Sequence, residues 1–167
     1  MASQAALPPC EVACVAVIGN NNSPLFLKVY KDVAQALPRR ADESLELQMQ
    51  EVVYNSLDVI EERMFSTRVL QNQGFLGCLS VVGPISLYGL STCTKEKIVV
   101  GFRKAAEVRD AVLEAVLRAV HRVLVEAYLN PFMPLDLSIR SKRFEAKVDE
   151  IAEMRGDAHG GGKPGGG

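Results

Sequence analysis

The sequence lacks the features that usually assign a chemistry at once. It has only four cysteines and two histidines, and no two cysteines have the C-x-x-C spacing of a zinc or redox site. It contains no phosphate-binding glycine loop, no dinucleotide fingerprint and no H-E-x-x-H metal motif. No set of residues supplies a nucleophile, a base and an orienting acid together. We therefore predict a protein that is not an enzyme and that uses no metal and no cofactor.

Neither charge nor hydropathy selects nucleic acid or a membrane as a partner. Nineteen basic and twenty acidic residues give a net charge of −1, which provides no general attraction to nucleic acid or anionic lipid. No apolar run approaches the ~20 residues of a spanning helix, and the first ten residues do not resemble a signal peptide. We expect a soluble, intracellular protein in which Cys14 and Cys78 are buried free thiols.

The remaining composition is that of a single globular domain. The chain has 167 residues, of which 48% are hydrophobic and 23% charged. Residues 155–167 are rich in glycine and almost without apolar side chains, so we expect a disordered tail. Residues 1–10 are predicted to be a flexible extension. The folded unit is expected to span residues 11–154.

Strand signals occur in two groups. Residues 12–18 are apolar, rich in β-branched side chains and followed by Gly19, which indicates a strand buried on both faces. Residues 20–24 have turn chemistry, so residues 25–30 are predicted to form the second strand of a hairpin. Three further runs, separated by short turns, predict an antiparallel meander. These runs are residues 75–82, 85–92 and 97–102.

Helical periodicity begins at Asp42, the predicted N-cap, and continues to Met64 as one amphipathic helix. A second long helix is predicted over residues 108–127, with an apolar face composed of valine and alanine and with Pro131 beyond its end. A short helix capped by Ser141 follows. Residues between these elements, including 31–41, are predicted loops. The order β-β-α-β-β-β-α-α defines an α/β (α+β) fold, a five-stranded, mainly antiparallel sheet flanked by helices.

The outer face of the first predicted helix carries both charged and apolar side chains. A helical projection places Asp58 nearly opposite the middle of the apolar stripe, with Asn55 and Glu62 on the same side. Leu47 and Tyr54 share that face. Composition alone favours a solvated face with incidental apolar residues. The alternative is a partner surface, in which Tyr54 and Leu47 are apolar contacts beside an orienting carboxylate.

Five segments occur in a recognisable order and spacing. They are Val12-Ala13-Cys14-Val15-Ala16-Val17-Ile18, Ser23-Pro24-Leu25-Phe26, Ser56-Leu57-Asp58-Val59-Ile60-Glu61-Glu62, Asn130-Pro131-Phe132 and Ile139-Arg140-Ser141-Lys142-Arg143-Phe144. Together they resemble the sedlin family over roughly residues 11–151. Each motif is weak alone, but the five in order are fairly specific. The resemblance implies a longin-like fold, and the predicted order of strands and helices agrees with it independently.

The resemblance implies a non-catalytic subunit of the TRAPP vesicle-tethering complex, which acts in ER-to-Golgi transport. Such a subunit is a protein–protein interaction module that helps to assemble the exchange complex of a Rab GTPase. The implied partners are other TRAPP subunits and, indirectly, the Rab GTPase, with no nucleic acid. The implied location is cytoplasmic and peripheral at ER and Golgi membranes, through the complex alone.

The resemblance also bears on the outer face of the first predicted helix. The family's Leu-Asp-x-x-[Asp/Glu]-Glu segment, which is associated with subunit contacts, falls on Asp58 in this sequence. It therefore favours a partner interface formed by Asp58, Tyr54, Leu47, Asn55 and Glu62.

Two other functions remain open at the level of the sequence. One is a different longin-type protein, such as the small chain of a vesicle-coat adaptor, which would bind a large adaptin-type partner. The other is a small-molecule sensor or carrier with a PAS-like or profilin-like sheet. That function requires a polar-lined cavity, whereas the predicted strands offer mainly aliphatic side chains.

Overall fold

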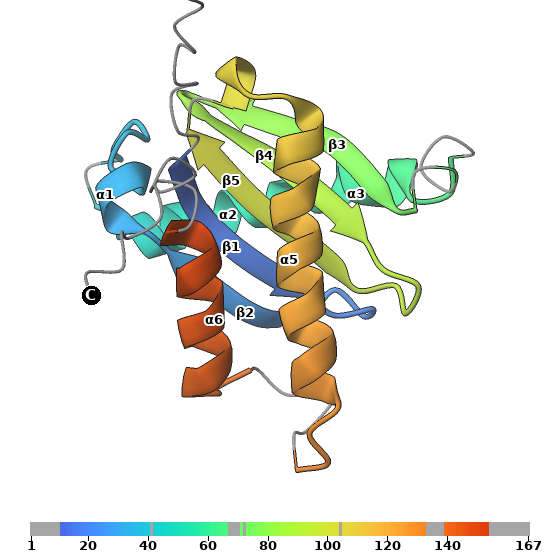
Figure 1. Ribbon diagram of the computed structural model, residues 1–167. Helices are drawn as coiled ribbons and strands as arrows, with labels where there is room; N and C mark the ends of the chain where they lie inside the picture. The colour runs from blue at the N-terminus through green and yellow to red at the C-terminus, as the bar shows by residue number, and fades with distance from the viewer. Residues whose placement is uncertain are drawn as a thin grey trace, which may run out of the picture.

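The chain forms a five-stranded sheet with helices on both faces (Figure 1). The computed structural model describes residues 11–40, 42–66, 71, 73–103, 105–132 and 139–153. The strands are β1 (Glu11–Ile18), β2 (Pro24–Val29), β3 (Phe75–Val82), β4 (Ile85–Ser91) and β5 (Lys97–Arg103). The helices are α1 (Lys31–Ala34), α2 (Leu45–Asn55), α3 (Leu57–Arg63), the 3-10 helix η1 (Ala105–Glu107), α5 (Asp110–Tyr128) and α6 (Lys142–Glu153). The predicted N-terminal extension and glycine-rich tail lie outside the described residues.

The strand order in the sheet is β2-β1-β5-β4-β3, and every neighbouring pair is antiparallel. The predicted β1–β2 hairpin and the predicted β3–β4–β5 meander are both confirmed. Every residue of β1 after Glu11 is buried, because helices cover both sides of the sheet there. The predicted fold class is therefore correct.

Two apolar cores lie on opposite sides of the sheet. In Figure 1, α5 and α6 cross the near face, and α2 and α3 lie behind the strands. Val15 and Val17 of β1 belong to the core beneath α5 and α6, whereas Cys14 and Ala16 belong to the core beneath α2 and α3. This division follows from the strand itself, since successive side chains point to opposite faces of a sheet.

The apolar face of α5 differs from the predicted one. The valine and alanine face is wrong at Ala111 and Ala115, which are exposed. The residues that α5 buries are Leu113, Val116, Leu117, Val120 and Leu124. Leucines determine the orientation because each removes more apolar surface from water than an alanine does. As predicted, the helix ends before Pro131, its last residue being Tyr128.

An aromatic contact joins α6 to β2, and a hydrogen bond joins it to Tyr30, the residue that follows β2. Ser141 caps α6 as predicted, its Oγ accepting the Phe144 N–H at 3.3 Å. The Phe144 ring packs edge-to-face on Phe26, with centroids 4.9 Å apart. The Tyr30 hydroxyl donates to Asp149 at 2.7 Å, and burial, followed by this hydrogen bond, raises the pKa of the phenol. These contacts hold one end of the hairpin from the α6 side.

The single helix predicted from Asp42 to Met64 is instead two helices, α2 and α3, joined at Ser56. Ser56 is buried, and its hydroxyl donates to the Val53 carbonyl at 2.5 Å. Such a bond to the preceding turn bends a helix. The predicted cap was also wrong, because Ser44 occupies that position and its Oγ accepts the Leu47 N–H at 3.2 Å.

The predicted loop over residues 31–41 contains the one-turn helix α1. Ala34 of α1 and Leu37 beyond it are buried against the core on the α2 side of the sheet. A single turn carries too few residues to show a helical period. Burial of these two side chains, rather than a sequence pattern, therefore accounts for its formation.

Candidate protein interface on α2 and α3

The helices α2 and α3 pack one side on the sheet and expose the other. Met49, Val53 and Ile60 are buried in the core between these helices and the strands. The predicted interface residues lie on the outer side, where Leu47 is 53% exposed. Three more of them are also exposed, namely Asn55, Asp58 and Glu62. The bend at Ser56 therefore leaves all four side chains exposed to solvent.

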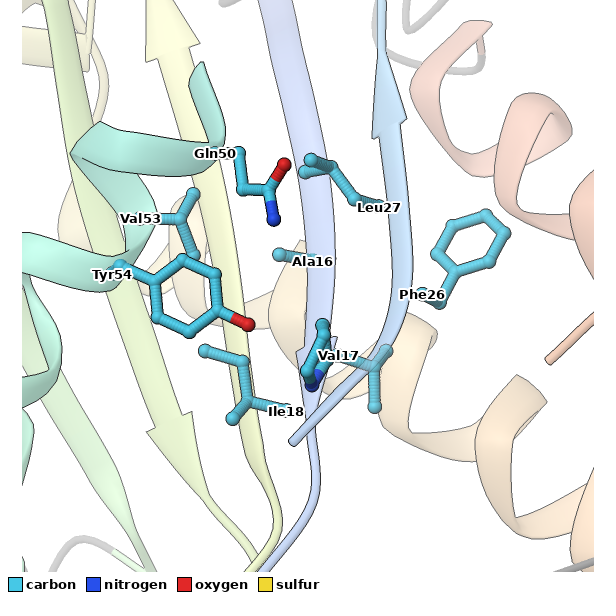
Figure 2. Close-up of a pocket in the computed structure, with 9 residues that line it drawn as sticks. Ala16, Val17, Ile18, Phe26, Leu27, Gln50, Val53 and Tyr54 are labelled. Atoms are coloured by element: carbon cyan, nitrogen blue, oxygen red, sulfur yellow. The ribbon is translucent and has the colours of Figure 1, made fainter. Parts of the chain in front are cut away.

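Tyr54, the fifth predicted interface residue, is half-buried rather than exposed. Its side chain lines a pocket of about 120 Å³ between α2 and the β1–β2 hairpin. Figure 2 shows the two walls of this pocket, which are Gln50, Val53 and Tyr54 on the helix, and Ala16, Ile18 and Leu27 on the hairpin. Most of these side chains are apolar, so the pocket favours an apolar occupant.

The acidic side chains of α2 have partners within the described part of the chain. Glu51 pairs with Arg40 at 2.9 Å, and Glu46 lies 3.7 Å from Lys31. Both pairs are largely exposed, so each contributes little to stability. These two charges are nevertheless partly neutralised in the monomer.

Asp58 and Glu62 of α3 differ, because neither forms an ion pair with another described residue. They are four positions apart, a spacing at which two like charges on one helix repel each other by ~0.2–0.5 kcal/mol. Asp58 has partial compensation from the positive end of the helix dipole, since it lies in the first turn of α3. The isolated chain thus presents two exposed carboxylates that a cation from outside would stabilise.

Two polar contacts fix α3 against the sheet. Arg63 donates to the backbone carbonyls of Cys78 at 2.6 Å and Leu76 at 3.3 Å on the edge strand β3. On another side, Asn22 of the β1–β2 turn donates to Glu61 at 2.7 Å. The outward position of α3 is therefore held from both edges of the sheet.

Lys97 of β5 forms a hydrogen bond with the same turn. It is 3% exposed and its ammonium donates to the Asn22 side-chain oxygen. Burial lowers the pKa of this ammonium, and the nearby Glu61 charge acts in the opposite direction. Asn22 has a φ of 63°, a left-handed conformation that asparagine tolerates better than most residues. The chain Lys97–Asn22–Glu61 joins β5, the hairpin turn and α3.

In the described part of the chain, potential metal ligands are scattered rather than clustered. Among them, no three His, Cys, Asp or Glu side chains form a group suited to a metal ion. No helix in the described ranges is long and apolar enough to cross a bilayer. Cys14 is a buried free thiol, as predicted, and burial raises its pKa to about 12. Cys78 is also free but only half-buried, which corrects the prediction of full burial.

The pocket is the part of this surface that sequence reasoning missed. Gln50 and Tyr54 are four positions apart on α2, so helical spacing alone places them on one side. Their proximity to Leu27 follows from the position of β2 at the edge of the sheet, which the sequence does not specify. The sequence therefore predicts a helix face with both charged and apolar residues, but it does not predict the pocket beside that face.

The architecture, an antiparallel five-stranded sheet with helices on both faces, places the chain in the α+β class and is consistent with a longin-like fold. A family model described as sedlin matches residues 17–154. The chain belongs to the sedlin family.

Individual relatives agree with that assignment along nearly their whole length. A "Trafficking protein particle complex subunit 2-like protein" of Dictyostelium discoideum is 27% identical over 141 residues, which cover 84% of this chain and 96% of the relative. Proteins of the same name from Bos taurus and Mus musculus are 29% and 28% identical over 142 residues, covering 83% of this chain and 94% of each relative. The resemblance inferred from five short segments is confirmed.

Proposed function

We propose that this protein is a non-catalytic subunit of the TRAPP vesicle-tethering complex in ER-to-Golgi transport. The observation that carries the proposal is its similarity to proteins named trafficking protein particle complex subunit 2-like over at least 94% of their length. A chain that matches such subunits over nearly their whole length can form the same domain and occupy the same position in an assembly. Its contribution is to bind other subunits rather than to make or break bonds.

The surface we assign to these contacts is the outer side of α2 and α3. It comprises Leu47, Tyr54, Asn55, Asp58 and Glu62. The exposed Leu47 and the half-buried Tyr54 lie near carboxylates that have no ion-pair partner among the described residues, a combination suited to an interface with an apolar centre and a polar rim. On the opposite side of α3, the buried Ile60 and the hydrogen bond from Arg63 to β3 hold the helix in place beneath that interface.

In this proposal the protein acts on a Rab GTPase only indirectly, by helping to assemble the complex that exchanges its nucleotide. Its partners are the other TRAPP subunits, and nucleic acid is not among them. The chain is cytoplasmic, and it reaches ER and Golgi membranes through the complex.

Affinity capture of the full chain, followed by quantitative mass spectrometry, tests this function. We expect TRAPP subunits in constant proportion to the tagged chain through a sizing column. Large adaptin-type chains in their place would establish the vesicle-coat alternative instead. A stoichiometric small molecule with no protein partner would establish the sensor alternative.

A further inference from the structure

The pocket between α2 and the β1–β2 hairpin has dimensions that limit its occupant. Its volume is about 120 Å³, whereas sites for small-molecule ligands usually measure ~300–1,000 Å³. An apolar protein cavity of ~150 Å³ can hold a benzene molecule. The pocket is therefore too small to enclose a nucleotide-sized cofactor and large enough for one apolar side chain.

Two acidic side chains follow the pocket along the chain, on α3. Tyr54 lines the pocket near the end of α2, and Asp58 follows it by four residues, across the bend at Ser56. Four residues advance about 6 Å along a regular helix. Glu62 lies one further turn along α3. Since Asp58 and Glu62 have no ion-pair partner among the described residues, the surface offers an apolar cavity followed by two available carboxylates.

We propose that this pocket receives one aliphatic or aromatic side chain from a neighbouring subunit, and that a lysine or arginine of the same segment pairs with Asp58 and Glu62. The inference rests on the proposed function, because it specifies the chemistry of the partner at the same surface. An extended segment advances ~3.3 Å per residue. The basic residue therefore lies about two to four positions from the apolar anchor.

A buried aromatic or aliphatic anchor usually carries more binding energy than the contacts around it. The pocket is consequently the place where the interface is most sensitive to a change of shape. Gln50 lies on the helix wall and is only half-buried, so a larger side chain there can fill the pocket from its rim.

Gln50→Trp is the variant that tests the pocket. With the full chain and purified TRAPP subunits, we expect Gln50→Trp to weaken binding by about 30-fold or more, the loss typical of a buried anchor. Arg122→Trp is the matched control, because it adds the same indole to an exposed position of α5 on the other side of the sheet. We expect its binding to equal that of the wild type.

A crosslinking experiment identifies the partner segment without filling the pocket. Leu47→p-benzoylphenylalanine places a photoreactive group at the exposed end of the same helix face. We expect crosslinks to a subunit peptide that contains an apolar residue with a lysine or arginine two to four positions away. Changing that basic residue to glutamate should weaken binding, and Asp58→Arg should restore it.

The outcomes separate this inference from the proposed function. Loss of binding in Asp58→Arg together with normal binding in Gln50→Trp would overturn the pocket but leave the function standing. Normal binding in both would remove the α2–α3 surface from the assembly altogether. A crosslink to a second copy of the chain, or to an acidic or wholly polar peptide, would also overturn the inference.

Discussion

Asp58→Arg should strongly weaken subunit binding while leaving the fold intact. The side chain is exposed on α3 and has no ion-pair partner among the described residues. Its replacement therefore opens no cavity and leaves no buried partner without its contact. Whatever Asp58 does is expected to appear in the complex and not in the monomer.

The magnitudes follow from the position of Asp58 on its helix. Loss of a carboxylate from the first turn and gain of a cation there each cost ~0.3–1 kcal/mol through the helix dipole. Removing the repulsion with Glu62 returns ~0.2–0.5 kcal/mol, and an attraction between the new guanidinium and Glu62 returns a similar amount. The net loss of stability should be about 0.5–1 kcal/mol, or about 2–4 °C in Tm.

In the proposed complex the same substitution would place a cation against the basic residue of the partner. Disrupting one side of a buried charged pair costs ~2–5 kcal/mol, which corresponds to about 30- to 4,000-fold in Kd. The assay is titration of labelled chain with purified TRAPP subunits, alongside a thermal melt of the free chain.

Ile60→Ala, on the same helix, is a control variant that is expected to lower the stability of the free chain. Ile60 is completely buried, so its truncation should cost ~2–5 kcal/mol of stability. An Asp58→Arg chain that melts like Ile60→Ala, or that binds like the wild type, would refute the reasoning.

Three further results are expected. Stability should fall as the pH rises above about 10, because the Tyr30 phenol of the unfolded chain ionises there while that of the folded chain, with its raised pKa, keeps its proton. Thermal melts from pH 8 to 11 should show a shallower fall of Tm in Tyr30→Phe than in the wild type. Truncation after Arg155 should change Tm by less than ~4 °C, since the glycine-rich sequence removed offers almost no apolar surface; a larger drop would show that it docks. The purified chain alone should not accelerate nucleotide release from a Rab GTPase, and exchange that a point variant abolishes would contradict a non-catalytic role.

The elements that sequence reasoning located best are those with a strong local signal. The apolar run of β1 and the two turns of the β3–β4–β5 meander are local signals, and both predictions are confirmed. The pairing of β1 with β5 places β1 inside the sheet and joins residues that are 79 to 92 positions apart in the sequence. No local pattern specifies that pairing.

The errors have a common physical origin in tertiary contacts. The break at Ser56 depends on a buried hydroxyl that bonds to Val53, and serine occurs in unbroken helices too. The orientation of α5 depends on which of two overlapping stripes meets the sheet, and the bulkier leucines prevail over the alanines. Both outcomes are set by packing that the chain reaches only when folded.

The candidate interface was likewise predictable where it depends on helical spacing and unpredictable where it depends on tertiary packing. The outward positions of Leu47, Asn55, Asp58 and Glu62 follow from helical spacing, and the structure places all four at the surface. The pocket beside Tyr54 requires the hairpin and α2 to meet at a particular distance, so it appears only in three dimensions.

Carboxyl footprinting tests the central claim, that α2 and α3 form the subunit contact, most directly. The free chain and the reconstituted TRAPP assembly would be treated with a carbodiimide and an amine, and the modified residues counted by mass spectrometry. We expect Asp58 and Glu62 to react in the free chain and to be protected in the assembly, while Glu150, exposed on α6, reacts equally in both. Protection of Glu150 with full reaction at Asp58 and Glu62 would place the contact on the opposite side of the sheet and contradict the account.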